Sequence, residues 1–247
     1  MNIAFKDRVV LVTGGTRGIG KAIANMFAED NASVIATGTD KQQLEQLNNQ
    51  SKSSGIHYRH LDFTSTASVE SFLDYLKSLK KVDVLVNCAG VNKINLIDEI
   101  NDEDWDWMNT INLRGPYLIS KAISAMMKAT GYGRIVNISS IFGVVSKIKR
   151  ASYSTTKWGL IGFTKAIALD LGEHNILVNA VSPGFVDTDL TRKILGEDEI
   201  KSIIQDIPVK KLAVPDDIAR TVLFLSSDMN TYITGQNIII DGGFTSA

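Results

Sequence analysis

The feature that most constrains this sequence is a regular alternation of short apolar runs with helical patterns, repeated about six times along the chain. The apolar runs are rich in β-branched residues, as in residues 8–13 and 32–37, which is typical of strands buried on both faces. No linker or change of composition interrupts the alternation. Such a pattern favours a parallel sheet with helices on both faces. We therefore expect one doubly wound α/β domain over residues 1–247.

The remaining apolar runs complete a predicted sheet of about seven strands. They cover residues 56–60, 82–86, 134–138, 176–181 and 237–240. Helices are expected from residue 41 and over residues 65–80, 152–172 and 216–227, with a loop and one long helix over residues 98–128. Residues 187–206 are polar and helical with few apolar anchors, which predicts a mobile substrate lid.

Composition excludes several classes of function. The net charge is −1 and no long basic run occurs, so nothing favours nucleic acid as a partner. A single cysteine, Cys88, excludes an internal disulfide and a multi-cysteine metal site, and we expect no metal. No apolar run approaches the roughly 18 residues of a membrane span, and the N-terminus has no apolar signal segment. We expect a cytoplasmic protein without membrane contact.

The first predicted strand runs directly into a glycine-rich turn, and a helical pattern follows. Gly14, Gly18 and Gly20 are spaced Gly-x-x-x-Gly-x-Gly. Glycines permit a tight turn and the approach of a pyrophosphate to the backbone, while a helix N-terminus offers free N–H groups. A structural turn is the alternative, but the strand–helix context favours a phosphate-binding loop.

The end of the second predicted strand indicates which dinucleotide is preferred. In dinucleotide-binding folds a carboxylate here binds the ribose of NAD, whereas its absence together with an arginine suits NADP. Gly38 occupies the position of that acid, Thr39 follows, and Arg17 stands in the glycine loop. Asp40 comes one or two residues late for the NAD role. The sequence favours NADP and leaves NAD possible.

Later strand ends carry further candidate residues. Asp62 follows the third strand and is expected to cap the next helix, to accept a hydrogen bond from the adenine amino group, or both. The small residues of Asn87–Gly90 suit a floor on which a flat ring rests. Ligands of open α/β sheets bind beyond the carboxyl ends of the strands, and Pro183 and Gly184 also fall there.

The segment from Ser139 to Lys157 carries the expected chemistry. Tyr153 and Lys157 are spaced i, i+4, so on a helix they share one face. Ser140 follows the strand at residues 134–138. A second Tyr-x-x-x-Lys pair, Tyr117 and Lys121, lacks such a serine and is interpreted as a helix-surface pair. We expect Tyr153 to act as general acid in reduction and general base in oxidation, Lys157 to lower its pKa and hold the nicotinamide ribose, and Ser140 to bind the substrate oxygen.

These residues together resemble the motif set of the short-chain dehydrogenases/reductases over essentially the whole chain. The matching motifs are Thr13-Gly14-x-x-x-Gly18-x-Gly20, Asn87-Cys-Ala-Gly90, Asn112, Ser140, Tyr153-x-x-x-Lys157 and Pro183-Gly184. The segments at residues 184–189 and 232–243 are similar to those of bacterial 3-oxoacyl-[acyl-carrier-protein] reductases. Cys88 departs from the family's Asn-Asn-Ala-Gly and is interpreted as a buried small residue rather than a redox group.

The resemblance implies a single-domain Rossmann fold, an NAD(P)-dependent carbonyl–alcohol oxidoreductase, and a homotetramer. It implies that Asn112 orders a water that connects Lys157 to solvent, whereas the sequence alone also allows a helix-kink residue. The expected catalytic residues are Ser140, Tyr153, Lys157 and Asn112. The expected cofactor-binding residues are Gly14, Thr16, Arg17, Gly18, Ile19, Gly20, Gly38, Thr39, Asp62, Phe63, Asn87, Ala89, Gly90, Tyr153, Lys157, Pro183, Gly184, Val186 and Thr188.

The substrate is left open by the sequence. An acyl-carrier-protein thioester fits the resemblance, and a sugar, a polyol or another small ketone is the alternative, because a fold does not choose its substrate. Lys147, Lys149 and Arg150 lie close to the expected pocket; they suit an acidic carrier, a phosphate or a sugar carboxylate, and simple solvation is the alternative. A non-catalytic NADP-binding scaffold is a third possibility, against which the complete Ser, Tyr, Lys and Asn set argues.

Overall fold

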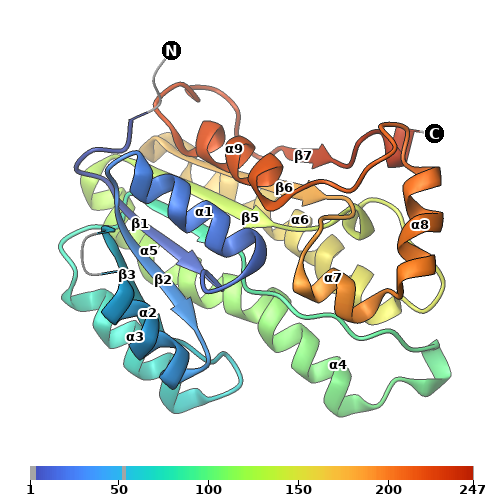
Figure 1. The fold of residues 1–247 in the computed structure, drawn as a ribbon. Helices are drawn as coiled ribbons and strands as arrows, with labels where there is room; N and C mark the ends of the chain where they lie inside the picture. The colour runs from blue at the N-terminus through green and yellow to red at the C-terminus, as the bar shows by residue number, and fades with distance from the viewer. Residues whose placement is uncertain (1–3, 52–53, 247) are drawn as a thin grey trace.

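The computed structural model describes residues 4–51 and 54–246, and its central element is one parallel sheet (Figure 1). The strands within these residues are β1 (Val9–Thr13), β2 (Ser33–Gly38), β3 (Ile56–His60), β4 (Val84–Asn87), β5 (Gly133–Ile138), β6 (Ile176–Pro183) and β7 (Asn237–Ile240). Their order is β3-β2-β1-β4-β5-β6-β7, and every neighbouring pair is parallel. The predicted doubly wound sheet is confirmed. The first three residues of the N-terminal segment considered above lie outside the described residues.

Helices cover both faces of the sheet (Figure 1). They are α1 (Gly18–Glu29), α2 (Lys41–Gln50), α3 (Thr66–Ser78), α4 (Asp102–Asn109), α5 (Gly115–Thr130), α6 (Ala151–Leu171), α7 (Asp189–Ile194), α8 (Glu197–Asp206) and α9 (Pro215–Ser226). Side chains alternate along β1, so Val10 and Val12 pack against α1, α2 and α9, while Leu11 packs against α3, α5 and α6. Two apolar cores therefore sandwich the sheet, which explains the continuous apolar character of its strands.

The sheet order places a crevice where the predicted site should be. From β1 the chain winds outward through β2 to β3, then returns to β4 on the other side of β1 and continues to β7. The loops after β1 and β4 therefore diverge to opposite faces, which opens a space between them. All strands are parallel, so the loops after β5 and β6 lie at the same edge.

The segment over residues 98–128 differs from the single long helix that we expected. Helix α4 ends at Asn109, a π-helical turn spans Thr110–Arg114, and α5 begins at Gly115. Pro116 has no N–H to donate to the carbonyl of Asn112, so a continuous α-helical ladder is broken at this point. The bulge buries Asn112 completely. Asn112 therefore lies in an irregular, π-helical turn between α4 and α5.

The predicted lid contains more apolar anchors than expected. Residues 187–206 form α7 and α8, and Leu195, Ile203 and Ile207 are buried in a small cluster of their own. Phe185 and Phe244 pack against this cluster. The segment is thus a packed cap at the carboxyl edge of the sheet, and its mobility stays a prediction. No helix within residues 4–51 and 54–246 is long and apolar enough to cross a membrane.

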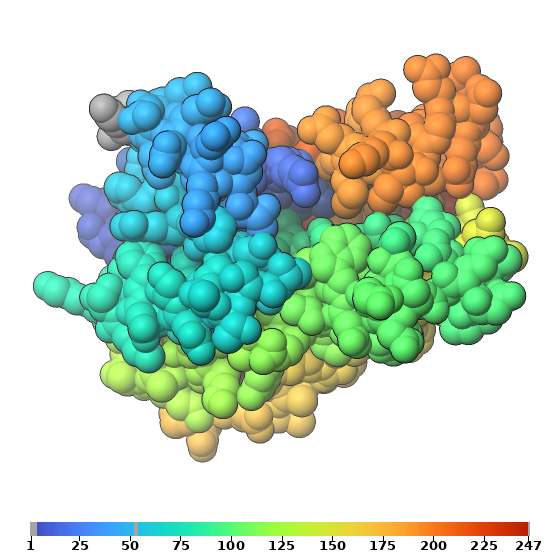
Figure 2. Space-filling view, turned by 90° about the horizontal axis from the view of Figure 1, so that it is seen from below, coloured from blue at the N-terminus to red at the C-terminus, as the bar shows by residue number. Residues whose placement is uncertain are grey.

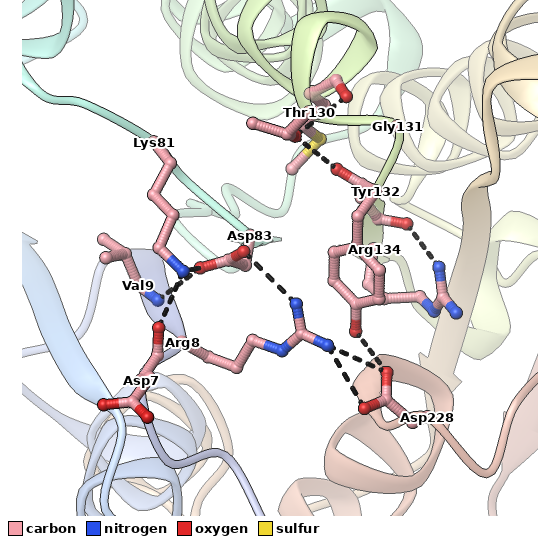
Figure 3. A network of polar contacts seen from close by, with 12 residues as sticks. Asp7, Arg8, Val9, Lys81, Asp83, Thr130, Gly131, Tyr132, Arg134 and Asp228 are labelled. Carbon is pink, nitrogen blue, oxygen red and sulfur yellow. Dashed lines mark hydrogen bonds and ion pairs between the residues drawn. The ribbon is translucent and has the colours of Figure 1, made fainter.

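A polar network closes the opposite, amino edge of the sheet (Figure 3). Asp83 is buried and accepts hydrogen bonds from the backbone N–H of Val9 at 2.7 Å and from Arg8 at 3.4 Å. The ring of Tyr132 lies under two guanidinium groups, those of Arg8 at 3.8 Å and Arg134 at 4.5 Å. Burial, the largest cause, raises the pKa of Tyr132 to about 12. The network ties β1 to β5 away from the crevice.

Arg134 should be a main contributor to stability at this edge. It is buried and donates to the carbonyls of Gly133 at 2.8 Å, Asn175 at 3.1 Å and Asn230 at 3.2 Å. We expect Arg134→Met to lower the free energy of unfolding by about 2–4 kcal/mol, because three carbonyls lose their donor and Tyr132 loses one of its two cations. The thermal unfolding midpoint measures this. Arg220→Met is the control, since Arg220 pairs only with Asp217 at the surface. Equal stability of the two variants would contradict the assignment.

Candidate active site

A cavity of about 720 Å³ lies at the carboxyl edge of the sheet. Figure 2 shows the hollow between the blue segments of the N-terminal half and the orange segment of α7. Loops after β1, β2, β3, β4, β5 and β6 line it, so residues far apart in the chain meet there. Of the predicted site residues, Asn87 and Asn112 do not line the cavity and lie behind its wall, and all the others line it.

The glycine loop has the geometry that a diphosphate requires. Gly14 and Gly18 adopt φ of +68° and +52°, in the left-handed region that favours glycine. A Cβ on Gly20 would lie 2.2 Å from the Gly14 carbonyl oxygen, so only glycine lets α1 start this close to the loop. Arg17, the N-cap of α1, makes no side-chain cap hydrogen bond, and the first turn has no acidic residue. The first N–H groups of α1 are therefore available to an anion.

The end of β2 has no room for a carboxylate. A Cβ on Gly38 would lie 2.6 Å from the methyl group of Thr16, so any side chain there would clash. Asp40 is the N-cap of α2 and accepts from the backbone N–H of Gln43 at 3.1 Å. Arg17 is exposed at the rim of the same part of the cavity. Arg17 is thus the cation available in this part of the cavity, and the Asp40 carboxylate is engaged in capping α2.

Asp62 does not cap the following helix, contrary to one of our expectations. The N-cap of α3 is Ser65, which accepts from the backbone N–H of Ser68. Asp62 Oδ1 instead accepts from the backbone N–H of Thr64 at 2.9 Å and from its hydroxyl at 2.7 Å. Asp62 lies three positions before the N-cap, and its carboxylate accepts from Thr64 two residues further along the chain instead of from an N–H group of α3. Asp62 and Phe63 still line the cavity, and the contact with adenine stays a prediction.

The floor of the cavity is held by buried polar contacts. Thr13 Oγ1 accepts from the backbone N–H groups of Cys88 at 3.0 Å and Ala89 at 3.2 Å, which ties the glycine loop to the end of β4. Asn87 donates to Asn137 Oδ1 at 2.8 Å. Burial, the largest cause, raises the pKa of Cys88 to about 12. The thiol therefore stays protonated, as expected for a residue without a redox role, but Cys88 is only partly buried and lines the cavity.

Asn112 is a clamp rather than a cavity residue. Its Oδ1 accepts from the backbone N–H of Val91 at 2.8 Å, and its Nδ2 donates to the Val91 carbonyl at 2.9 Å. The same Nδ2 donates to Thr156 Oγ1 at 3.1 Å. The π-helical turn thus joins the floor loop to α6. A water relay at Asn112 stays a prediction.

Lys157 is buried beneath Tyr153. Its Nζ donates to the Ile138 carbonyl at 2.9 Å and lies 5.6 Å from the centroid of the Tyr153 ring. Burial, the largest cause, lowers the pKa of Lys157 to about 8. The ammonium therefore exchanges its proton near neutral pH, which is useful for a group that passes protons.

Ser140 and Tyr153 lie on the same wall of the cavity. Ser140 Oγ accepts from the backbone N–H of Phe142 at 3.2 Å, so its own O–H can still be donated. The pKa of Tyr153 is raised, mainly by burial, while Ser140 and Arg150 act in the opposite direction. We had expected Lys157 to lower this pKa, but Lys157 is not among the groups that shift it, and the pKa is raised by burial. A phenol protonated at neutral pH is the form that a general acid requires.

The three cations before Tyr153 do not behave alike. Lys147 and Lys149 are exposed, and Lys147 lies 3.7 Å from Glu199. Arg150 is 6% exposed and lines the cavity, with its guanidinium 5.2 Å from the centroid of the Phe142 ring. Solvation therefore explains the two lysines but not Arg150.

The second Tyr-x-x-x-Lys pair lies elsewhere. Tyr117 is 43% exposed on α5, Lys121 Nζ lies 3.4 Å from its hydroxyl, and neither residue lines the cavity. The interpretation as a helix-surface pair is correct.

Comparisons with known proteins agree with this geometry. A family model described as Enoyl-(Acyl carrier protein) reductase matches residues 14–245. The 3-oxoacyl-[acyl-carrier-protein] reductase FabG of Aquifex aeolicus strain VF5 is 38% identical and covers 98% of this chain and 99% of its own. FabG of Escherichia coli K12 is 37% identical, and the match covers 97% of this chain and 98% of that protein. The structure of a gluconate 5-dehydrogenase from Burkholderia cenocepacia J2315, in complex with NADP and tartrate, superposes with a TM-score of 0.92. Its sequence is 27% identical, and the match covers 99% of this chain and 97% of that one.

The match extends from the glycine loop to the segment after β7, so it includes every element that forms the cavity. Sequence motifs, sheet order and site geometry agree with it. The chain belongs to the short-chain dehydrogenase/reductase family.

Proposed function

We propose that the protein is an NADP(H)-dependent oxidoreductase that interconverts a carbonyl and an alcohol. The observation that carries the proposal is the wall formed by Ser140, Tyr153 and the buried Lys157, at the end of a cavity that begins at the glycine loop. A protein that only bound the nucleotide would not need a buried lysine beneath the tyrosine of the cavity wall, because burying an ammonium costs free energy.

The residues of the cavity fit NADP(H). The glycine loop and the open N-terminus of α1 would hold the diphosphate, and Arg17 would pair with the 2′-phosphate at the end of β2. Lys157 and Tyr153 would hold the nicotinamide ribose over the floor at Asn87–Gly90. Pro183, Gly184, Val186 and Thr188 line the same part of the cavity and would cover the ring.

The chain's own residues would manage the proton. When bound, the nicotinamide supplies or accepts the hydride at the carbonyl carbon. Ser140 donates to the carbonyl oxygen and stabilises the negative charge that develops there. Tyr153 donates its proton to that oxygen in reduction and accepts it in oxidation. Lys157 replaces the proton on Tyr153, and Asn112 keeps the floor and α6 in register.

The proposed substrate is a 3-oxoacyl thioester carried by acyl carrier protein, because the relatives at 37–38% identity carry that activity in their names. A small sugar acid or ketone is the second candidate, supported by the structural likeness to a gluconate 5-dehydrogenase. The homotetramer, the cytoplasmic location and the mobile lid at residues 187–206 stay predictions.

A panel of carbonyl compounds tests the function. The oxidation of NADPH and of NADH is followed at 340 nm with a 3-oxoacyl thioester, sugar ketones and simple ketones. We expect turnover with NADPH and at least one carbonyl class. Tight NADPH binding without any turnover would support a non-catalytic scaffold instead.

Tyr153→Phe should abolish turnover, by roughly 10²–10⁴-fold or more, because no proton reaches the carbonyl oxygen. Binding of NADPH, measured by its fluorescence, should stay close to that of the unmodified protein. Tyr117→Phe is the matched control, since Tyr117 starts the surface copy of the same motif. An active Tyr153→Phe variant would rule out Tyr153 as the acid.

Arg17→Ala should raise the KM for NADPH by about 10- to 100-fold, because a charge-assisted hydrogen bond to the 2′-phosphate is lost. The KM for NADH should stay nearly unchanged, since NADH has no 2′-phosphate. Lys21→Ala removes a cation from the same helix outside the cavity and is the control. An equal loss for both cofactors would show that Arg17 does not read the 2′-phosphate.

The rate of reduction should depend on the protonation of Lys157. Because burial lowers the pKa of this group to about 8, kcat for reduction should fall as pH rises through that value. The kcat for oxidation, in which the enzyme takes up the proton of the alcohol, should rise over the same pH interval. Steady-state rates of reduction and oxidation measure this dependence. The pH range runs from roughly 6 to 10, about two units on each side of the Lys157 pKa. A flat reduction profile would contradict the proton-supply role.

A further inference from the structure

The parallel sheet has a free edge at β3, far from the cavity wall formed by β5 and α6. The strand order ends at β3 on one side and at β7 on the other (Figure 1). An edge strand presents a row of N–H and C=O groups to which a strand of another chain can add. The state of that row on β3 therefore decides whether copies of the protein can associate through this edge.

The backbone of β3 alternates between β2 and the free edge. The N–H of Val34 in β2 donates to the Gly55 carbonyl at 2.9 Å, and Val34 lies level with Ile56 in the register. In a parallel pair, the residue that lies level with a bonded neighbour turns its own N–H and C=O groups the other way. The groups of Ile56, Tyr58 and His60 therefore point away from β2, with Tyr58 at the centre of the row.

Asn48 of α2 covers the centre of this row. Its Oδ1 accepts from the backbone N–H of Tyr58 at 2.8 Å, and its Nδ2 donates to the Tyr58 carbonyl at 2.9 Å. A carboxamide has the donor and the acceptor of a peptide unit, so Asn48 occupies the place of the next strand. Leu44, one turn earlier on the same face of α2, is buried in the core and holds this helix against the edge.

We infer that Asn48 keeps the β3 edge closed to a second copy of this chain, whose own β3 would otherwise pair with it. The edge is complementary to itself. In an antiparallel pair about a two-fold axis, Tyr58 faces the same residue of the second copy, and each N–H meets the other carbonyl. The clamp prevails because it lies within one chain, whereas association costs translational and rotational freedom. Asn48 and Tyr58 do not line the cavity, so this role is independent of the proposed reaction.

Removal of the clamp gives the first test. Asn48→Ala frees both backbone groups of Tyr58, and we expect association that increases with concentration, beyond the assembly size of the unmodified protein. Size-exclusion chromatography with light scattering measures the mass. Asn49→Ala is the matched control, because Asn49 is exposed at the next position of α2 and the change in helix propensity is the same. Its mass should equal that of the unmodified protein.

Thermal unfolding separates the clamp from a merely structural contact. If Asn48 only fastened α2 to β3, Asn48→Ala would lower the unfolding midpoint and leave the mass unchanged at every concentration, and this result would overturn the inference. Equal association of Asn48→Ala and Asn49→Ala would overturn it as well. Asn48→Asp should not associate, because it keeps an acceptor for the Tyr58 N–H and places a charge at the edge.

The charge at residue 57 gives the second test and identifies the pairing. His57 and Arg59 are exposed, and in the two-fold antiparallel pair each lies opposite the other of the second copy. In the Asn48→Ala background, His57→Lys places two cations opposite each other, whereas His57→Glu places a carboxylate opposite Arg59. Because each contact contains two such pairs, the dissociation constant should rise about 2- to 30-fold with lysine and fall about as much with glutamate.

The same two changes at residue 57 with Asn48 in place should leave the mass unchanged. If association of the Asn48→Ala variants did not depend on residue 57, or changed in the same direction for lysine and glutamate, it would be unspecific aggregation and not pairing of β3. That result would overturn the inference even if the Asn48→Ala variant were only partly folded.

Discussion

Backbone-to-backbone contact at the crevice between β1 and β4 is the constraint on which the rest of the structure depends. A Cβ on Gly14 would lie 2.8 Å from the Cα atom of Ala89, and one on Gly20 would lie 2.2 Å from the Gly14 carbonyl oxygen. Because no side chain intervenes, the glycine loop, the start of α1 and the floor loop occupy one small volume. The sheet supplies the rest, since its strand order reverses at this point and all its carboxyl ends share one edge.

Burial sets the chemistry of the wall opposite the glycine loop. The same desolvation acts in opposite directions on an acid and a base: it raises the pKa of the Tyr153 phenol and lowers that of the Lys157 ammonium. The pKa of Lys157 therefore falls to about 8 while that of Tyr153 rises above its ordinary value, so transfer of a proton from the ammonium to a Tyr153 phenolate is favourable. The clamp of Asn112 on Val91 and Thr156 keeps the floor and α6 together behind this wall.

Much of this could be predicted from the sequence, because strands, glycines and helix spacing are local signals. Apolar runs alone were enough to predict the ranges of β3 and β7. The i, i+4 spacing was enough to predict that Tyr153 and Lys157 share one face of α6. The errors have physical causes. The π-helical turn depends on Pro116 and the tertiary contacts of Asn112, and Asp62 forms a turn with Thr64 instead of capping α3. The position of Arg150, whose role the sequence left open, depends on Phe142, a residue of a different element. Propensity and period do not report which way a loop side chain points.

Two buried arginines show how differently the two edges of the sheet satisfy a buried cation. Arg134, at the amino edge, donates to three carbonyls and lies over the Tyr132 ring. Arg150, at the carboxyl edge, has a ring face but no acceptor for its buried Nε and Nη1 atoms. Both arginines keep buried nitrogen atoms without a partner among the described residues, Nε in Arg134 and both Nε and Nη1 in Arg150. Desolvation makes both side chains costly, and the cost is better offset at Arg134, where three carbonyls accept its N–H groups.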